Sequence, residues 1–145
     1  MEIGLVFALC WGVTVAMQCS FFVVAFLCAF DKVTDLAGSA NFIVLGLLTL
    51  FLAPSEFTTR QIVLTSLVCV TRLELGAYLL YRVLKRGKDS RFDELRAKCL
   101  SFFGFWVYQM LWVYLVSAPL IYVNASDVDP PLGPVDYAGW AMVVV

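Results

Sequence analysis

The sequence contains no histidine, and its five cysteines show none of the C-x-x-C spacings that bind zinc or carry redox chemistry. An imidazole acid, base or metal ligand is therefore absent from these 145 residues. Cys10, Cys19 and Cys28 recur every nine residues, which turns a helix by about half a revolution each time. They do not share one helix face, so we expect neither a metal site nor a disulfide cluster.

Charge is also scarce, because only 14% of the residues are charged while 62% are hydrophobic. That composition excludes a soluble domain of this size. Several apolar runs reach the ~20 residues with which a helix crosses the ~30 Å hydrocarbon core of a bilayer. None of them alternates with a period of two, so a membrane β-barrel is disfavoured. The sequence predicts an integral membrane protein surrounded by lipid.

The apolar runs predict an all-α fold, a bundle of four transmembrane helices followed by the start of a fifth. All of it forms one membrane domain, residues 1–145. We place the four spans at residues 3–30, 36–53, 61–81 and 100–123, and the partial span at 137–145. The first run is longer than the apolar part of a secretory signal and has no basic segment before it, so we interpret it as a retained helix.

Basic residues are concentrated in one segment, 82–98, which holds most of the 10 lysines and arginines. An excess of these residues in a short loop marks the cytosolic-equivalent face of a membrane protein. We therefore place this loop on the cytosolic-equivalent face. We expect the membrane to be that of the endoplasmic reticulum or an organelle inner membrane. Acidic residues interrupt the loop and no aromatic platform accompanies it, so nucleic acid is not an expected partner.

The segment 124–136 carries aspartates and prolines but no base, so we expect it in water on the opposite side. It begins with Asn124-Ala125-Ser126, which matches the N-x-S glycosylation pattern. The sequence does not decide whether this asparagine is modified.

Strongly polar side chains inside the predicted spans are Gln18, Arg72, Glu74 and Gln109. Counted at ~1.5 Å per residue from the basic ends of the spans, all four lie roughly 12 to 18 Å deep. A charge there costs about 2.5 to 3.5 kcal/mol, so Arg72 and Glu74 should face protein or a wet cavity. Because they are two residues apart, they point in different directions and each needs its own partner. Two explanations of such a layer stay open. One is hydrogen bonding that holds the bundle together, and the other is a polar pocket that opens to the basic face.

At residues 72–92, RLELGAYLLYRVLKRGKDSRF, the chain resembles the steroid 5α-reductase-like family of polytopic membrane proteins, in a branch without an assigned substrate. Two more stretches are similar to that family. They are DKVTDLAGSANF at 31–42 and FFGFWVYQMLWVYLVSAPL at 102–120. The resemblance covers roughly residues 31–124 and concerns the amino-terminal part of the family only.

The resemblance implies a helical bundle that binds NADPH from the cytosolic side and reduces a carbon-carbon double bond of a lipid or sterol-like ligand. It places the loop at the cofactor mouth, where Lys88 or Arg91 meets a phosphate and Asp89 orients it. It implies no catalytic residue within this chain. The family's later cofactor-binding stretch, of Arg-His-Pro-Asn-Tyr type, is not found in a sequence without histidine.

Two functions stay open on these grounds, and the sequence leaves undecided whether the chain is an enzyme. The one we favour from sequence is a non-catalytic integral subunit of a larger membrane complex, with other membrane chains as partners and no cofactor of its own. The alternative is the amino-terminal part of an NADPH-dependent reductase. A channel or transporter is a weaker interpretation, because no inverted repeat is visible.

Overall fold

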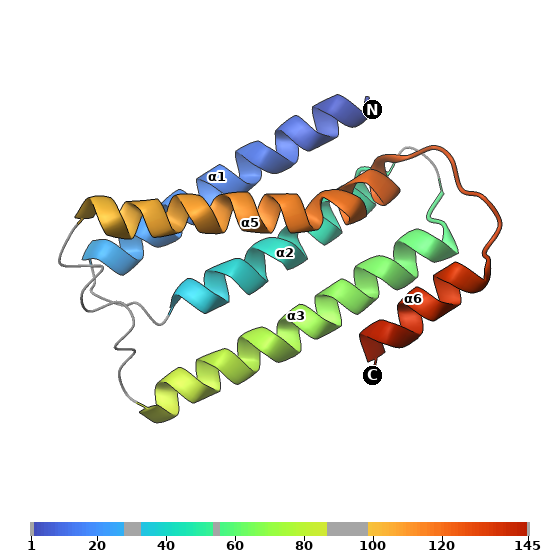
Figure 1. The fold of residues 1–145 in the computed structure, drawn as a ribbon. Helices are drawn as coiled ribbons and strands as arrows, with labels where there is room; N and C mark the ends of the chain where they lie inside the picture. The colour runs from blue at the N-terminus through green and yellow to red at the C-terminus, as the bar shows by residue number, and fades with distance from the viewer. Residues whose placement is uncertain (1, 28–32, 54–55, 87–98, 145) are drawn as a thin grey trace.

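The computed structural model describes residues 2–27, 33–53, 56–86 and 99–144. This part of the chain forms helices and no strand (Figure 1): α1 (Ile3–Leu27), α2 (Val33–Phe51), α3 (Thr59–Arg86), α5 (Cys99–Ala125) and α6 (Pro134–Val144). Of these, α1, α2, α3 and α5 are long and apolar enough to cross a membrane. The predicted all-α membrane bundle is confirmed, and the protein is an integral membrane protein.

The four long helices alternate in direction, so their ends gather at two ends of the bundle (Figure 1). We call the end where α3 stops and α5 starts the basic end, after Arg82 and Lys85 in the last turns of α3. We call the other end the acidic end, after Asp129 and Asp136. Helix α2 lies in the middle of the bundle, whereas α3 lies at its edge, with α6 beside the acidic half of α3 (Figure 1).

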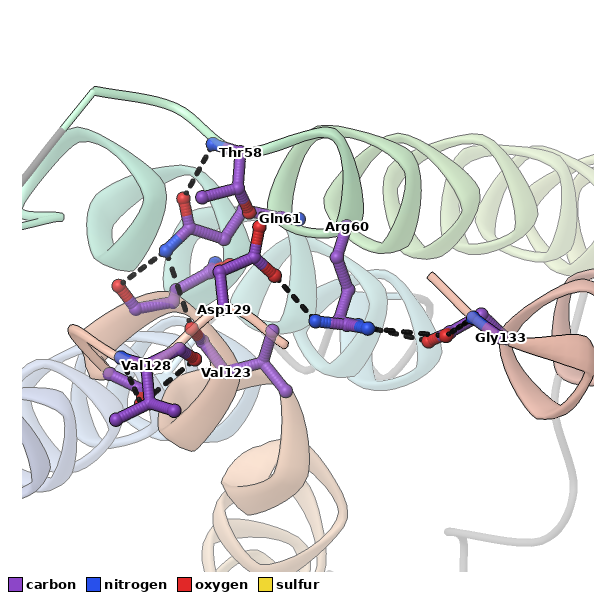
Figure 2. A network of polar contacts seen from close by, with 10 residues as sticks. Thr58, Arg60, Gln61, Val123, Val128, Asp129 and Gly133 are labelled. Atoms are coloured by element: carbon purple, nitrogen blue, oxygen red, sulfur yellow. Dashed lines mark hydrogen bonds and ion pairs between the residues drawn. The ribbon is translucent and has the colours of Figure 1, made fainter. Parts of the chain in front are cut away.

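Capping explains why α3 and α6 both begin earlier than predicted. The Gln61 N–H donates to Thr58 Oγ1 at 3.3 Å, and the Thr58 N–H donates to Gln61 Oε1 at 3.0 Å (Figure 2). This reciprocal pair is a capping box, which starts α3 before the predicted residue 61. Helix α6 opens with a proline, and Asp136 Oδ2 accepts the Gly133 N–H at 2.8 Å. That combination starts α6 before the predicted residue 137.

At the basic end, charged residues extend two helices beyond the predicted spans. Helix α3 continues past residue 81 to Arg86, since the long side chains of Arg82 and Lys85 can reach water from a helix that leaves the hydrocarbon core. Helix α2 begins before residue 36, with Asp35 in its first turn, where a carboxylate interacts favourably with the helix dipole. Residues 28–30 of the predicted first span lie outside the described residues.

Two hydrophobic clusters fill the interior between α1, α2 and α5. The larger lies toward the acidic end and contains Val6, Cys10, Phe42, Leu45, Val113, Ile121 and Ala125. The smaller lies toward the basic end and contains Ala25, Ala37, Phe102 and Trp106. Each helix thus contributes to both clusters, and polar side chains lie on the stretches between them.

Helices α2 and α3 pack closely where Gly76 meets Ser39. A Cβ atom at Gly76 would lie 3.0 Å from Ser39 Cβ and 3.2 Å from Ser39 Oγ, so a side chain there would push the two helices apart. Small residues allow this kind of close contact between membrane helices.

We expect Gly76→Leu to lower the free energy of unfolding by about 1 to 3 kcal/mol, the usual cost of inserting methylene groups into a packed contact. Thermal unfolding in detergent measures this loss. Gly12→Leu on α1 is the matched control, because a Cβ at Gly12 meets nothing within 4 Å. Equal melting temperatures for the two variants would contradict the close packing of α3 on α2.

Candidate functional site

Amide side chains of α1, α2 and α5 form one hydrogen-bonded layer between the two hydrophobic clusters. Gln18 Nε2 donates to Asn41 Oδ1 at 3.0 Å, and Gln109 Nε2 donates to Gln18 Oε1 at 3.1 Å. The same Gln109 nitrogen donates to the Thr34 carbonyl oxygen at 3.1 Å. We call Gln18, Asn41 and Gln109, which are all buried, the amide layer. Bonds of this kind in a membrane contribute about 0.6 to 1.7 kcal/mol each, so the layer stabilises the contact of three helices.

The sequence places Gln18 and Gln109 at a common depth, and in the structure they bond to each other. It does not single out Asn41, because a count from the predicted span end at residue 36 puts this residue only ~7.5 Å deep. Helix α2 in fact begins at Val33, so Asn41 lies roughly 12 Å from its start, at the depth of the other polar residues.

Arg72 does not join the amide layer, because its guanidinium lies against aromatic rings. Its Cζ atom lies 4.1 Å from the centroid of the Phe42 ring and 5.9 Å from that of Trp112. Both are cation–π distances. Among the described residues, no carboxylate pairs with Arg72 and no acceptor takes a hydrogen bond from it.

Arg72 lines a pocket of about 230 Å³ between α2, α3 and α5, which we call the Arg72 pocket. Its walls are Thr34, Asp35, Gly38, Ser39 and Phe42 from α2, Arg72, Leu75 and Leu79 from α3, and Phe105, Tyr108, Gln109 and Trp112 from α5. Most of this lining is apolar or aromatic, with a few polar groups that converge on one space. Pockets that bind small molecules have this composition.

The two ends of the Arg72 pocket carry opposite charges. Near the basic end, Asp35 Oδ2 lies 3.9 Å from Arg82 Nη2. Arg72 lies deeper, roughly 20 Å along α3 from its basic end at ~1.5 Å per residue. The pocket therefore extends from a carboxylate near the membrane surface to a guanidinium near mid-membrane. This arrangement can hold a molecule with a polar atom at its inner end and apolar groups along its length.

Glu74 lies apart from both features. It is exposed on the side of α3 that faces away from the bundle, because two residues on a helix differ by about 200°. Of the four predicted polar residues, Gln18 and Gln109 thus belong to the amide layer, Gln109 and Arg72 line the pocket, and Glu74 faces outward. Arg72 and Glu74 do point in different directions, as expected from their spacing.

The cofactor contacts that the resemblance implies, Lys88, Asp89 and Arg91, lie outside the described residues. Two basic residues just before them are described. Arg82 is near Asp35, and Lys85 is exposed with its Nζ atom 5.7 Å from the centroid of the Tyr81 ring. Arg82 therefore places a cation beside Asp35 at the surface end of the Arg72 pocket, whereas Lys85 lies with Tyr81 on another side of α3.

A second polar cluster ties α6 to α3 at the acidic end (Figure 2). Arg60 Nε and Nη2 donate to the two carboxylate oxygens of Asp136 at 2.9 and 3.1 Å, and Nη1 pairs with Asp129. A bidentate arginine–carboxylate pair has a fixed geometry as well as a favourable charge. We call Arg60, Asp129 and Asp136 the Arg60 clasp. Its contacts therefore set the position of α6 along α3.

The hydrogen bonds from Arg60, and secondarily the Gly133 N–H, hold the pKa of Asp136 at about 2, below its ordinary value of 3.8. A carboxylate with a lowered pKa stabilises the folded state above its unfolded pKa, and this contribution is lost as the pH falls toward the folded value. We therefore expect α6 to stay docked at neutral pH and to loosen between about pH 4 and pH 2.

Hydrogen exchange of residues 134–144 measures this docking. At neutral pH we expect Asp136→Asn to lower the protection of α6 and Asp127→Asn, at an exposed site, to leave it unchanged. Unchanged protection in Asp136→Asn would contradict the role of the Arg60 clasp.

Asn124, the first residue of the glycosylation pattern, is fully buried at the acidic end. The two hydrogens of its Nδ2 group are shared among three acceptors, Thr49 Oγ1 at 3.0 Å, Thr65 Oγ1 at 3.1 Å and the Gly46 carbonyl oxygen at 3.3 Å. Beside it, Gln61 Nε2 donates to the Asn124 carbonyl oxygen at 3.3 Å. The nitrogen to which a glycan would be attached is therefore occupied in the contact between α2, α3 and α5.

Comparisons with known proteins identify a family. The sequence model of the family described as "Protein of unknown function (DUF1295)" matches residues 21–145, which include every residue that lines the Arg72 pocket. No curated protein and no solved structure matches the chain. Since the match covers most of its length, the chain belongs to the DUF1295 family.

Proposed function

We propose that this protein binds an amphipathic lipid in the Arg72 pocket and holds an oxygen atom of that lipid at the guanidinium. The observation that carries the proposal is the environment of Arg72. A cation near mid-membrane lies against the rings of Phe42 and Trp112, and no described residue accepts a hydrogen bond from it. Intramembrane charges of this kind usually belong to functional sites.

The hydrogen-bonding capacity of Arg72 favours an oxygen-bearing ligand. A guanidinium has five N–H donors, and aromatic faces compensate its charge without accepting those hydrogen bonds fully. Donors left unpaired in a medium of low dielectric constant are costly. A carbonyl, carboxylate or phosphate oxygen would remove that cost, so ligands with such a group are preferred over plain hydrocarbons.

The size of the pocket favours a lipid over a small soluble molecule. Its volume of about 230 Å³ is below the ~300 to 1,000 Å³ of pockets that enclose a whole drug-sized ligand. Only the polar end and the adjoining atoms of a lipid would fit. Leu75 and Leu79 extend the apolar lining along α3, so the remainder of the molecule can continue between the helices into the bilayer.

On the resemblance to steroid 5α-reductase-like proteins, we propose further that this lipid is a substrate whose carbon-carbon double bond is reduced. NADPH, when bound, supplies the hydride to one carbon of the double bond, and a proton from water adds to the other. In a lipid whose double bond is conjugated to a carbonyl group, Arg72 would hydrogen-bond the carbonyl oxygen and stabilise the negative charge that develops there. The Arg72 pocket is the substrate side of this proposed reaction.

The described residues at the basic end fit the phosphates of such a cofactor. Lys85 is exposed and has no carboxylate partner among the described residues, and Arg82 lies in the turn before it. Cations on the last turns of a helix, at the membrane surface, can pair with phosphate oxygens. Lys88, Asp89 and Arg91 remain the contacts that the resemblance proposes. We place this end on the cytosolic face, as the excess of basic residues predicts.

The non-catalytic subunit that the sequence favoured stays a prediction. One experiment separates it from the reductase. The protein in lipid nanodiscs is given an enone sterol and NADPH, and NADPH consumption and sterol binding are measured together. The proposed reductase consumes NADPH only when the sterol is present, and Arg72→Leu abolishes this consumption. Binding without consumption would favour the non-catalytic subunit, and the absence of binding would contradict the lipid site itself.

A further inference from the structure

From Val70 to Tyr81, helix α3 presents a second face whose side chains are exposed. Along this face lie Val70, Glu74, Tyr78 and Tyr81, which recur every three or four residues and form one stripe. Val70, Tyr78 and Tyr81 are 62%, 60% and 61% exposed, and Glu74 is exposed as well. We call these four residues the α3 outer face. Only 11% of the apolar window of α3 is buried, against 50% for α2, so α3 contacts the bundle on one side only.

The carboxylate is the feature that distinguishes this face from an ordinary lipid-facing surface. Glu74 lies roughly 18 Å from the basic end of α3 at ~1.5 Å per residue, close to mid-membrane. Ionisable side chains at that depth rarely face lipid and usually pair with one another. Among the described residues, Glu74 has no ion pair and no hydrogen bond.

The cations of the described spans cannot supply the missing partner. Arg72 lies on the opposite side of the helix and contacts Phe42. Lys85 is on the same side but roughly 16 Å farther along α3, near the membrane surface. A partner for Glu74 must therefore come from outside the described helices.

We infer that the α3 outer face is the docking site for a partner transmembrane helix that carries a lysine or arginine near its middle, paired with Glu74. Tyr78 and Tyr81 flank the carboxylate and supply aromatic contact surface, while Val70 leaves room for close approach. A second copy of this chain fits the face poorly. In a symmetric contact Glu74 would face its own equivalent, and the cation nearest in depth, Arg72, lies in its pocket.

Site-specific photocrosslinking in the native membrane tests this inference. The full chain carries p-benzoylphenylalanine in place of Tyr78 or, as a control, in place of Leu115, which is 65% exposed on α5. We expect a protein adduct from position 78 and none from position 115. Peptide mass spectrometry should find the adduct in an apolar segment of ~20 residues that contains a lysine or arginine near its centre.

The dependence on Glu74 is tested in the same assay. Glu74→Gln should lower the adduct yield roughly tenfold, whereas Glu74→Asp, which keeps the charge, should retain most of it. A charge exchange should restore the adduct yield. It combines Glu74→Lys in this chain with a glutamate in place of the lysine or arginine of the partner helix. Melting in detergent shows whether the Glu74 variants fold. If both unfold, the identity of the segment crosslinked from position 78 in the chain with Glu74 still tests the inference. An adduct with a second copy, with a segment lacking a base, or with lipid alone would overturn the inference.

Discussion

The Arg72→Leu variant is expected to bind an enone sterol roughly 10- to 150-fold more weakly than the wild-type protein. Hydrogen bonds to charged groups contribute about 1.5 to 3 kcal/mol, and this range converts to that loss of affinity. Leucine keeps an apolar side chain beside Phe42 and Trp112 while the N–H donors are removed. Titration of radiolabelled sterol into the purified protein measures the change.

Two further variants show whether the loss is specific to the guanidinium. Arg72→Lys should bind with intermediate affinity, because lysine keeps the charge but lacks the planar donor fork that stacks on aromatic rings. Glu74→Gln removes a charge at nearly the same depth on the other side of α3 and should leave sterol binding unchanged. If Arg72→Leu bound the sterol as tightly as the wild-type protein, the proposed contact would be absent.

The largest expected effect on stability comes from Asn124→Leu, which should lower the free energy of unfolding by about 2 to 3 kcal/mol. Leucine has a similar size, but it removes a nitrogen that donates to Thr49, Thr65 and the Gly46 carbonyl oxygen. Each such bond in a membrane contributes about 0.6 to 1.7 kcal/mol, and the freed acceptors are left buried. Thermal unfolding in detergent measures the loss.

Ser126→Ala is the matched control for this prediction. Both substitutions destroy the N-x-S pattern, but Ser126 Oγ only accepts the Val128 N–H at 3.1 Å and donates to the Val128 carbonyl oxygen at 3.4 Å on the exposed surface. We therefore expect Ser126→Ala to unfold at the wild-type temperature. Equal destabilisation by the two variants would mean that the pattern matters as a glycosylation site and not through packing.

The fold was largely predictable because the bilayer imposes a length and a composition on each span. Predominantly apolar runs located all four long helices, although the third contains Arg72 and Glu74, and alternation along the chain fixed which ends share a side. Helix boundaries were less predictable, since they depend on local caps. Helix α3 begins before its apolar run because Thr58 and Gln61 cap it. Helix α6 begins before its apolar run because Asp136 accepts the Gly133 N–H.

The depth of each site residue in the membrane was predictable, but the side of the helix bundle that its side chain faces was not. Counting residues from the span ends brought Gln18 and Gln109 to one level, where they bond. It also brought Glu74 to that level, although this residue faces outward. Depth follows from the helical rise alone, whereas direction depends on which face of α3 packs on α2, the face on which Gly76 meets Ser39.

Residues with short amide side chains were missed for a related reason. Asn41 and Asn124 stand among apolar and small residues, and the sequence treats the first as a packing residue and the second as part of a loop. Both became identifiable only when three helices were assembled around them. Polar groups in a bilayer form hydrogen bonds across helices, so such asparagines mark helix contacts once the neighbours are known.

Photoaffinity mapping of the bound lipid tests the central claim most directly. A diazirine analogue of an enone sterol is irradiated with the protein in nanodiscs, and the labelled residues are identified by mass spectrometry. We predict labelling inside the Arg72 pocket, on Leu75, Leu79 and Phe105, that unlabelled sterol competes away and that Arg72→Leu abolishes. Labelling confined to outward residues such as Leu73 and Leu115, without competition, would contradict a lipid site at Arg72.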